Sequence, residues 1–231
     1  MHMIKIIMFP YAGSMGYAYQ KMISYFDKSK FTVHMIDLNG RGEHVDYDSY
    51  DTWDELISDV YAQVDEIINQ NDDGYVLFGH SMGAKIVYDV YIKIKQKQNK
   101  SPMYVIFSGC KVHDTKNEYY KLIQKPQKDF EEEYINLGGI PEEVLADIDF
   151  KNYVFEIIKE DLRLLSQYKP KSKKITENVI ILNGTNDDRS SISDWKHLCS
   201  KIFYRIYPGN HFFIFQHPDK VVNDICNIIE N

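Results

Sequence analysis

The segment Gly79-His80-Ser81-Met82-Gly83 sets a serine hydroxyl between two glycines. It follows the apolar run 75–78 and precedes the helical pattern 84–91, a context typical of a sharp strand-to-helix turn. Such a turn strains the serine backbone, and side chains at positions 79 and 83 would crowd it. The turn would also place the hydroxyl at a helix N-terminus, where free N–H groups stabilise an oxyanion. The segment therefore predicts nucleophilic catalysis by Ser81.

A serine hydroxyl needs a base that removes its proton as it attacks. In hydrolases built on this turn, the partners follow in the order serine, acid and histidine, so the base should lie on a loop after the last strand. His211 and His217 have that position. We favour His211, which directly follows the predicted strand and a Pro-Gly turn, because His217 precedes Pro218 where capping the last helix is its simpler role. His80 is interpreted as a packing and hydrogen-bonding neighbour.

The acid must orient the imidazole and stabilise it when it is charged. Asp187 lies in a glycine-containing loop just after the apolar run 179–182, and catalytic groups collect at the carboxyl ends of parallel strands. Asp188 is adjacent, and Asp114 follows the strand that ends near Ser108, so both stay open as alternatives.

An oxyanion hole needs two backbone N–H groups, and the residue after the nucleophile, Met82, is expected to supply one. The second should come from the loop after the first strand, where Ala12, Gly13 and Ser14 would let the backbone approach a substrate closely. We expect Ala12 to be that donor, with Tyr11 as the next choice.

Short β-rich runs alternate with amphipathic helices, which predicts a doubly wound α/β fold with helices on both faces of a mostly parallel sheet of about six strands. The runs are nearly continuous in apolar residues, as in strands buried on both faces. The clearest helix begins with the capping box Thr52-x-x-Glu55. The expected strands cover residues 3–9, 32–37, 75–79, 103–108, 178–183 and 202–207.

Residues 115–170 interrupt this alternation, because they contain helical patterns and no convincing strand. A helical insertion of this size between two strands is typical of a lid over the active face. An enlarged crossover connection is the simpler alternative. We therefore predict a single domain over residues 1–231 with a helical lid at about 115–170.

Composition narrows the class of protein. The 231 residues are 44% hydrophobic and carry a formal net charge of −7, which suits one globular domain and disfavours a nucleic-acid binder. Three scattered cysteines without a C-x-x-C pair support neither a disulfide framework nor a zinc site, and a reducing cytoplasm is the expected setting. The apolar N-terminal run is too short for a signal peptide, and no run is long enough to span a membrane.

Five segments together resemble the type II thioesterases, a branch of the α/β-hydrolases that edits nonribosomal peptide and polyketide synthases as stand-alone enzymes. They are 9–13 (Phe-Pro-Tyr-Ala-Gly), 39–42 (Asn-Gly-Arg-Gly), 78–84 (Phe-Gly-His-Ser-Met-Gly-Ala), 184–187 and 210–213 (Asn-His-Phe-Phe). The similarity runs from about residue 4 to 225.

The resemblance implies Ser81 as nucleophile, Asp187 as acid and His211 as base, and it places the family's helical lid on the strand-free region. Two departures stand out: Asn39 where the family usually has proline, and Ser14 where it has a second glycine.

The implied substrate is an acyl or aminoacyl thioester on the phosphopantetheine arm of a carrier protein. No metal or other cofactor is implied, and the enzyme is expected to be a monomer. A small-molecule carboxylesterase or an acyltransferase is the alternative. A non-catalytic binding protein of this fold is disfavoured because all three triad residues are present.

Carrier proteins are often acidic, so a basic surface near the lid is a candidate docking site, although a solvated helix face is the simpler reading of its lysines. These are Lys111, Lys116, Lys121, Lys125 and Lys128.

Overall fold

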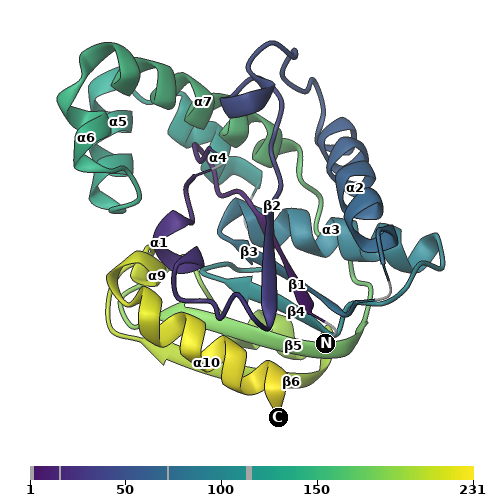
Figure 1. Cartoon of the computed structure of the whole chain (residues 1–231). Coiled ribbons are helices and arrows are strands. Elements are labelled where there is room, and N and C mark those ends of the chain that lie inside the picture. Colours follow the sequence, from purple (N-terminus) through teal and green to yellow (C-terminus); the bar gives the residue numbers. More distant parts are fainter. Residues whose placement is uncertain (1–2, 16, 72, 113–115) are drawn as a thin grey trace.

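A six-stranded sheet runs through the middle of the protein in the computed structural model, which describes residues 3–15, 17–71, 73–112 and 116–231 (Figure 1). Each pair of neighbouring strands is parallel, and the order across the sheet is β2-β1-β3-β4-β5-β6. The strands are β1 (Ile4–Phe9), β2 (Phe31–Met35), β3 (Tyr75–His80), β4 (Tyr104–Ser108), β5 (Ile175–Gly184) and β6 (Cys199–Tyr207).

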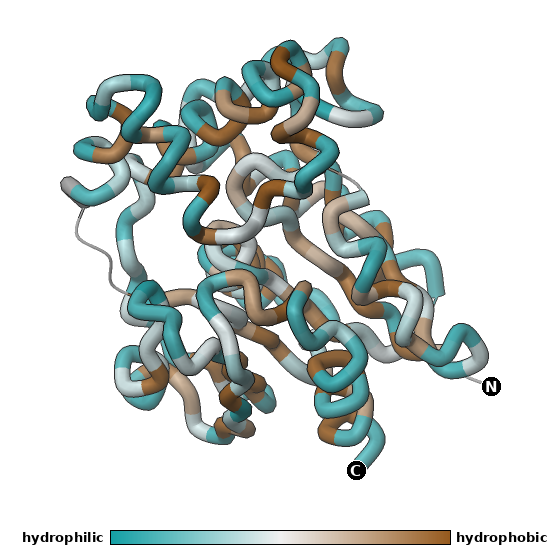
Figure 2. Tube along the Cα trace, turned by 90° about the vertical axis from the view of Figure 1, so that its left-hand side faces the viewer, coloured by the Kyte–Doolittle hydropathy of each residue, from teal (hydrophilic) through white to brown (hydrophobic). Residues whose placement is uncertain are grey.

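Helices cover both faces of the sheet, so the predicted doubly wound α/β fold is confirmed. One layer contains α2 (Trp53–Asn69), α3 (Met82–Gln96) and α8 (Ile192–Lys196), and the other contains α1 (Gln20–Ile23), α9 (Phe213–Gln216) and α10 (Pro218–Glu230). Each layer buries its own hydrophobic cluster against the strands. In Figure 2 hydrophobic positions follow the strands through the middle of the molecule.

The central strands β1, β3 and β4 are almost entirely buried, as their apolar runs predict. The same prediction is wrong for residues 202–207, because β6 lies at the edge of the sheet and has a neighbour on one side only. Most of its residues are exposed or half-buried, and Phe203 and Ile206 are among the exposed ones. β2, at the other edge, is also mostly half-buried.

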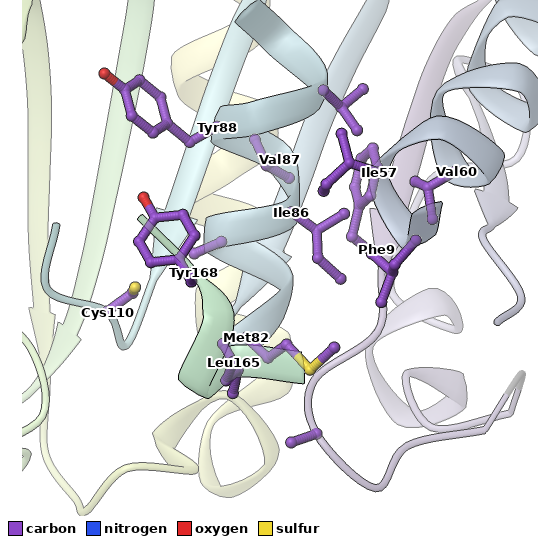
Figure 3. Close-up of a cluster of buried hydrophobic side chains, with 14 of the residues drawn as sticks. Phe9, Ile57, Val60, Met82, Ile86, Val87, Tyr88, Cys110, Leu165 and Tyr168 are labelled. Atoms are coloured by element: carbon purple, nitrogen blue, oxygen red, sulfur yellow. The ribbon is translucent and has the colours of Figure 1, made fainter. Parts of the chain in front are cut away.

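Helix α2 starts where the sequence predicts. The Thr52 side chain accepts a hydrogen bond from the Glu55 N–H, and the Glu55 side chain accepts one from the Thr52 N–H, which completes the capping box. The apolar face of α2 then packs toward β1 and α3; Figure 3 shows Ile57 and Val60 near Phe9 in this buried cluster.

Between β4 and β5, the described residues contain helices and no strand, as predicted. These helices are α4 (Lys116–Ile123), α5 (Gln127–Asn136), α6 (Glu142–Ala146) and α7 (Ile148–Gln167). They lie above the carboxyl ends of the strands in Figure 1, on the side where β3 runs into α3.

Helix α7 is tied to the body of the protein by polar contacts. The Arg163 guanidinium donates to the carbonyls of Tyr50 and Asp51, at 2.6 and 2.8 Å, and the Tyr153 hydroxyl donates to the Gly40 carbonyl at 3.3 Å. Its buried face includes Ile158, Leu162 and Leu165. These contacts hold α7 against the segment between β2 and α2.

Candidate active site

Ser81 has the strained backbone that the glycine spacing predicts. Its φ is 55° and its ψ is −117°, at the N-cap of α3. A Cβ at Gly79 would lie 2.2 Å from the Gly83 carbonyl oxygen, and one at Gly83 would lie 2.5 Å from the carbonyl oxygen of Phe9. Because both obstacles are backbone atoms, no side-chain rotation relieves the clash. Glycine is thus required at both positions, because the turn, the start of α3 and the loop after β1 lie in close contact.

His211 and Asp187 meet Ser81 at the carboxyl edge of the sheet. The Nε2 atom of His211 lies 3.0 Å from the Ser81 Oγ atom, and its Nδ1 atom lies 3.1 Å from each carboxyl oxygen of Asp187. Asp187 follows β5 and His211 follows β6, and these two strands are paired in parallel, so both loops leave the sheet at the same end.

The charge of Asp187 decides which nitrogen of His211 carries the proton. Burial opposes ionisation of Asp187, but the hydrogen bond and charge of His211 and the N–H of Arg189 outweigh it and lower the pKa of the carboxyl. An ionised carboxylate only accepts hydrogen bonds, so Nδ1 of His211 carries the proton and Nε2 is left to accept from the Ser81 hydroxyl. This is the tautomer that a general base requires.

Two of the alternatives from the sequence, Asp188 and His217, lie in the described residues, and Asp188 lines the cavity beside Ser81. Asp188 is exposed and makes no hydrogen bond to His211 among the described residues. His217 is the N-cap residue of α10, as expected from Pro218, but its side chain makes no capping hydrogen bond. Asp114 lies outside the described residues.

His80 is a packing neighbour of the site, as interpreted from the sequence. It is fully buried, its Nδ1 atom lies 2.9 Å from the Ser108 Oγ atom, and its ring centroid is 4.9 Å from that of His211. Burial, and then the proximity of His211, hold the pKa of His80 well below its usual range. A neutral His80 adds no competing positive charge beside His211.

The loop after β1 lies against the start of α3, which is where an oxyanion hole would form. The Gly13 N–H donates to a carboxyl oxygen of Asp161 at 2.8 Å, and the Ser14 N–H donates to the Tyr11 carbonyl at 3.0 Å. Within the described part of the chain, the N–H groups of Ala12 and Met82 donate to no protein acceptor. Those two N–H groups remain available for a substrate oxygen.

A cavity of about 620 Å³ opens beside Ser81 and His211. Ala12 forms part of its wall, together with Leu122, Tyr134 and Leu162 from the helices between β4 and β5. Charged side chains from the segment between β4 and β5 also line it, namely Lys111, Glu118, Lys121, Lys125 and Glu133. The cavity is therefore lined by both apolar and charged side chains.

A buried ion pair near this loop was not foreseen from the sequence. Arg41 and Asp161 are 5% and 0% exposed, and two guanidinium N–H groups donate to the two carboxyl oxygens at 2.6 and 2.5 Å. The signal that could have revealed it is an acidic residue on the apolar face of α7, because a buried carboxylate needs a partner.

Neither a metal cluster nor a membrane span is present in the described residues. In the described ranges, His, Cys, Asp and Glu side chains form no group of three that could hold a metal ion. None of the helices described is both long and apolar enough to cross a bilayer.

Comparison with known proteins places the chain in a family. The thioesterase domain model matches residues 4–229. The gramicidin S biosynthesis protein GrsT of Aneurinibacillus migulanus is 26% identical, over 96% of this chain and 88% of that protein. The medium-chain S-acyl fatty acid synthase thioesterase of Rattus norvegicus is 25% identical, over 98% of this chain and 88% of that protein.

Among solved structures, ClbQ from the colibactin NRPS/PKS pathway is similar with a TM-score of 0.85 and 26% identity, over 99% of this chain and 97% of that one. This similarity confirms the predicted α/β-hydrolase fold. Because the thioesterase model covers nearly the whole chain, the protein belongs to the thioesterase family and is a thioester hydrolase, which confirms the resemblance predicted from its motifs.

Proposed function

We propose that this enzyme hydrolyses acyl or aminoacyl thioesters held on the phosphopantetheine arm of carrier proteins, using Ser81 as nucleophile, His211 as base and Asp187 as acid. The observation that carries this proposal is the continuous hydrogen-bonded line from Asp187 through His211 to Ser81, which ends at a cavity with both apolar and charged walls. Editing of wrongly loaded synthase carriers is the proposed biological role.

The chemistry proceeds in two half-reactions. The Ser81 Oγ atom attacks the thioester carbonyl while His211 Nε2 takes its proton, and the N–H groups of Met82 and Ala12 hold the oxyanion. The C–S bond then breaks, and His211 returns the proton to the departing sulfur as a thiol forms. In the second half-reaction His211 takes a proton from water, the resulting hydroxide attacks the acyl-Ser81 ester, and the acid leaves as Ser81 is re-protonated. The phosphopantetheine belongs to the substrate, and no cofactor of the enzyme takes part.

The relatives support a carrier-bound substrate. One is a protein of gramicidin S biosynthesis and another comes from an NRPS/PKS pathway, and each aligns over most of its own length. The medium-chain thioesterase of fatty acid synthase is a further relative at similar identity. Acyl groups on these assembly lines share the phosphopantetheine thioester, so we propose that linkage as what the enzyme recognises.

The first test is intact-protein mass spectrometry of an acetyl-phosphopantetheinyl carrier protein incubated with the wild type and with Ser81→Ala. Loss of the acetyl mass with return of the free thiol, for the wild type only, is expected. If the acyl group stays on the carrier while a small ester is still cleaved, the enzyme is a carboxylesterase of the same fold. If the acyl group moves to an added alcohol or amine in preference to water, it is an acyltransferase.

We further propose that carrier proteins dock beside the cavity at a basic surface on α4 and the segment that follows it. Lys121 and Lys125 are exposed and line the cavity mouth, and complementary charge accelerates and orients association. Lys125 is paired with Glu133, so part of its charge is neutralised within the lid. Lys121 is therefore the more informative position.

Charge reversal tests this docking surface. Lys121→Glu, alone and combined with Lys125→Glu, should raise KM for an acyl carrier protein several-fold and leave KM for a small acyl thioester unchanged. Lys28→Glu is the matched control, because Lys28 is exposed just before β2, at the opposite end of the sheet from the cavity. Equal changes for both substrates, or an equal effect of the Lys28 variant, would remove this site from consideration.

A further inference from the structure

The Arg41–Asp161 pair connects three separate parts of the chain. Asp161 belongs to α7 of the lid region, and Arg41 immediately precedes the short 3₁₀ helix η1 (Gly42–His44) in the loop after β2. The same Asp161 oxygen that receives the Arg41 Nη1 hydrogen bond also accepts the Gly13 N–H, and Arg41 Nη1 lies 3.4 Å from the Ser14 carbonyl oxygen. The pair therefore contacts the loop after β1 through both a donor and an acceptor.

These contacts fall on the residues directly after the proposed oxyanion donor Ala12. Gly13 has a φ of +81°, and a Cβ at this position would lie 2.3 Å from Cγ1 of Ile158, so the loop turns in direct contact with α7. On its other side the loop is limited by α3, since a Cβ on Gly83 would meet the carbonyl oxygens of Phe9 and Pro10 at 2.5 and 2.9 Å. The loop is held between α3, which carries the nucleophile, and α7.

Burying two charges is costly unless their geometry is good and their remaining polar atoms are paired. Here the guanidinium donates two hydrogen bonds to the carboxylate and the Gly13 N–H donates a third, while the buried Arg41 Nε has no partner among the described residues. An apolar pair of equal volume could fill the same space but could not accept the Gly13 N–H. The arrangement thus has a role beyond packing.

We propose that Asp161 and Arg41 are positioning residues for catalysis: they fix the loop after β1 so that the Ala12 N–H points at the developing oxyanion. Asp161 acts by holding the Gly13 N–H, and Arg41 acts by holding Asp161 and the Ser14 carbonyl. This inference rests on the proposed oxyanion hole. It also assigns a role to Arg41 within the segment 39–42, which the triad chemistry alone does not use.

Asp161→Asn and Arg41→Lys test this role. Asparagine keeps the shape of the side chain but turns one acceptor into a donor that faces Arg41, and lysine keeps the charge but loses the two-pronged geometry. We expect kcat on a small acyl thioester to fall about 10- to 100-fold with KM nearly unchanged, since a displaced oxyanion donor weakens the transition state only.

A second measurement separates positioning from a general loss of structure. A trifluoromethyl ketone analogue forms a tetrahedral oxyanion adduct with Ser81, whereas the matching amide binds as a ground-state analogue. The affinity for the ketone should fall by the same factor as kcat, and the affinity for the amide should stay constant. The matched control is Asp89→Asn, which weakens another buried carboxylate contact, to Lys171 and Trp53, about two turns along α3 from Ser81 and at a separate pocket. That variant should lose stability but keep kcat.

Two outcomes would overturn the inference. One is an Asp161→Asn enzyme with wild-type kcat and wild-type ketone affinity. The other is an equal loss of kcat in the Asp161 and Asp89 variants, which would mean that the pair only stabilises the fold. Failure of the carrier-protein proposal would look different, because the wild type would then cleave the small thioester through Ser81 and leave the acyl carrier intact.

Discussion

Replacement of Gly83 by alanine would test whether catalysis requires the loop after β1 to lie in contact with the turn that carries Ser81. The new Cβ would lie 2.5 Å from the Phe9 carbonyl oxygen and 2.9 Å from that of Pro10, whereas ordinary contact begins at 3.4 Å. The loop therefore has to retreat by about 0.9 Å, which lengthens an oxyanion hydrogen bond of about 2.9 Å to about 3.8 Å, beyond hydrogen-bonding distance.

Loss of one oxyanion donor lowers kcat by about 10²- to 10³-fold, equivalent to about 3–4 kcal/mol of transition-state stabilisation. The assay is steady-state hydrolysis of a small acyl thioester, in which KM should change little. Alanine is also the better helix former by up to about 1 kcal/mol, which offsets part of the effect of the clash on the free energy of unfolding. The loss of transition-state stabilisation should therefore exceed the loss of folding stability. Thermal unfolding measured on the same preparations would show whether the variant is folded.

The control is Gly74→Ala, just before β3 at the opposite end of the sheet. Its Cβ would meet the Met103 side chain, chiefly the sulfur atom at 2.3 Å, and a half-exposed methionine can rotate away. This variant should keep wild-type kcat. If Gly83→Ala is folded and hydrolyses the thioester at the wild-type rate, the close contact between loop and turn does not serve catalysis and the proposed Ala12 donor is wrong.

Three further predictions follow from single side chains. Asp187→Asn should lower kcat by about 10³- to 10⁴-fold, because the amide favours the wrong imidazole tautomer, while Asp188→Asn should change it little; similar losses in both would contradict the assignment of the acid. Burial opposes ionisation of Glu177, but hydrogen bonds from neighbouring lysine, tyrosine and hydroxyl side chains outweigh it and lower its pKa to about 2. Because this pKa is lowered, the ionised carboxylate stabilises the folded protein above about pH 4.5, and the stabilisation is lost as the pH falls toward 2. Urea unfolding should therefore show that Glu177→Gln is less stable than the wild type by about 1–3 kcal/mol at pH 7. At pH 2 the two proteins should be nearly equal in stability. Burial raises the pKa of the Cys199 thiol to about 12 and that of Cys226 to about 11, so iodoacetamide at pH 8 should alkylate both much faster in urea than in buffer, as followed by peptide mass spectrometry.

The elements that hold the site could be predicted because their signals are local. A run of apolar residues ending in a glycine-flanked serine carries its strand, turn and helix in about fifteen consecutive positions. The loops that carry Asp187 and His211 follow equally clear strands, and the carboxyl ends of parallel strands converge by topology. Whether Asp187 or Asp188 faces His211 is a less local question, since it depends on which of two adjacent side chains turns inward.

Features that depend on distant pairing escaped prediction. The run 202–207 is mostly apolar, like the central strands, although Arg205 interrupts it, and the strand order places it at an edge. Similarly, Arg41 and Asp161 are separated by 120 positions, and neither residue indicates its partner. A buried charge can be suspected from an acidic residue on an apolar helix face, but its partner is defined only by the packing of α7 over the loops after β1 and β2.

The same packing distinguishes α7 from the other helices between β4 and β5. Helix α7 is bonded to the body through Arg163, Tyr153 and the buried Asp161, so moving it would break an ion pair and would free the Gly13 N–H. Lys121 of α4 and Lys125 in the segment after it are exposed and line the cavity. If substrate entry required α7 to move away, the loop after β1 would lose its contact with Asp161 as the substrate entered. Entry past α4 would leave these contacts intact, and under the proposed function it would bring an acidic carrier protein against Lys121 and Lys125.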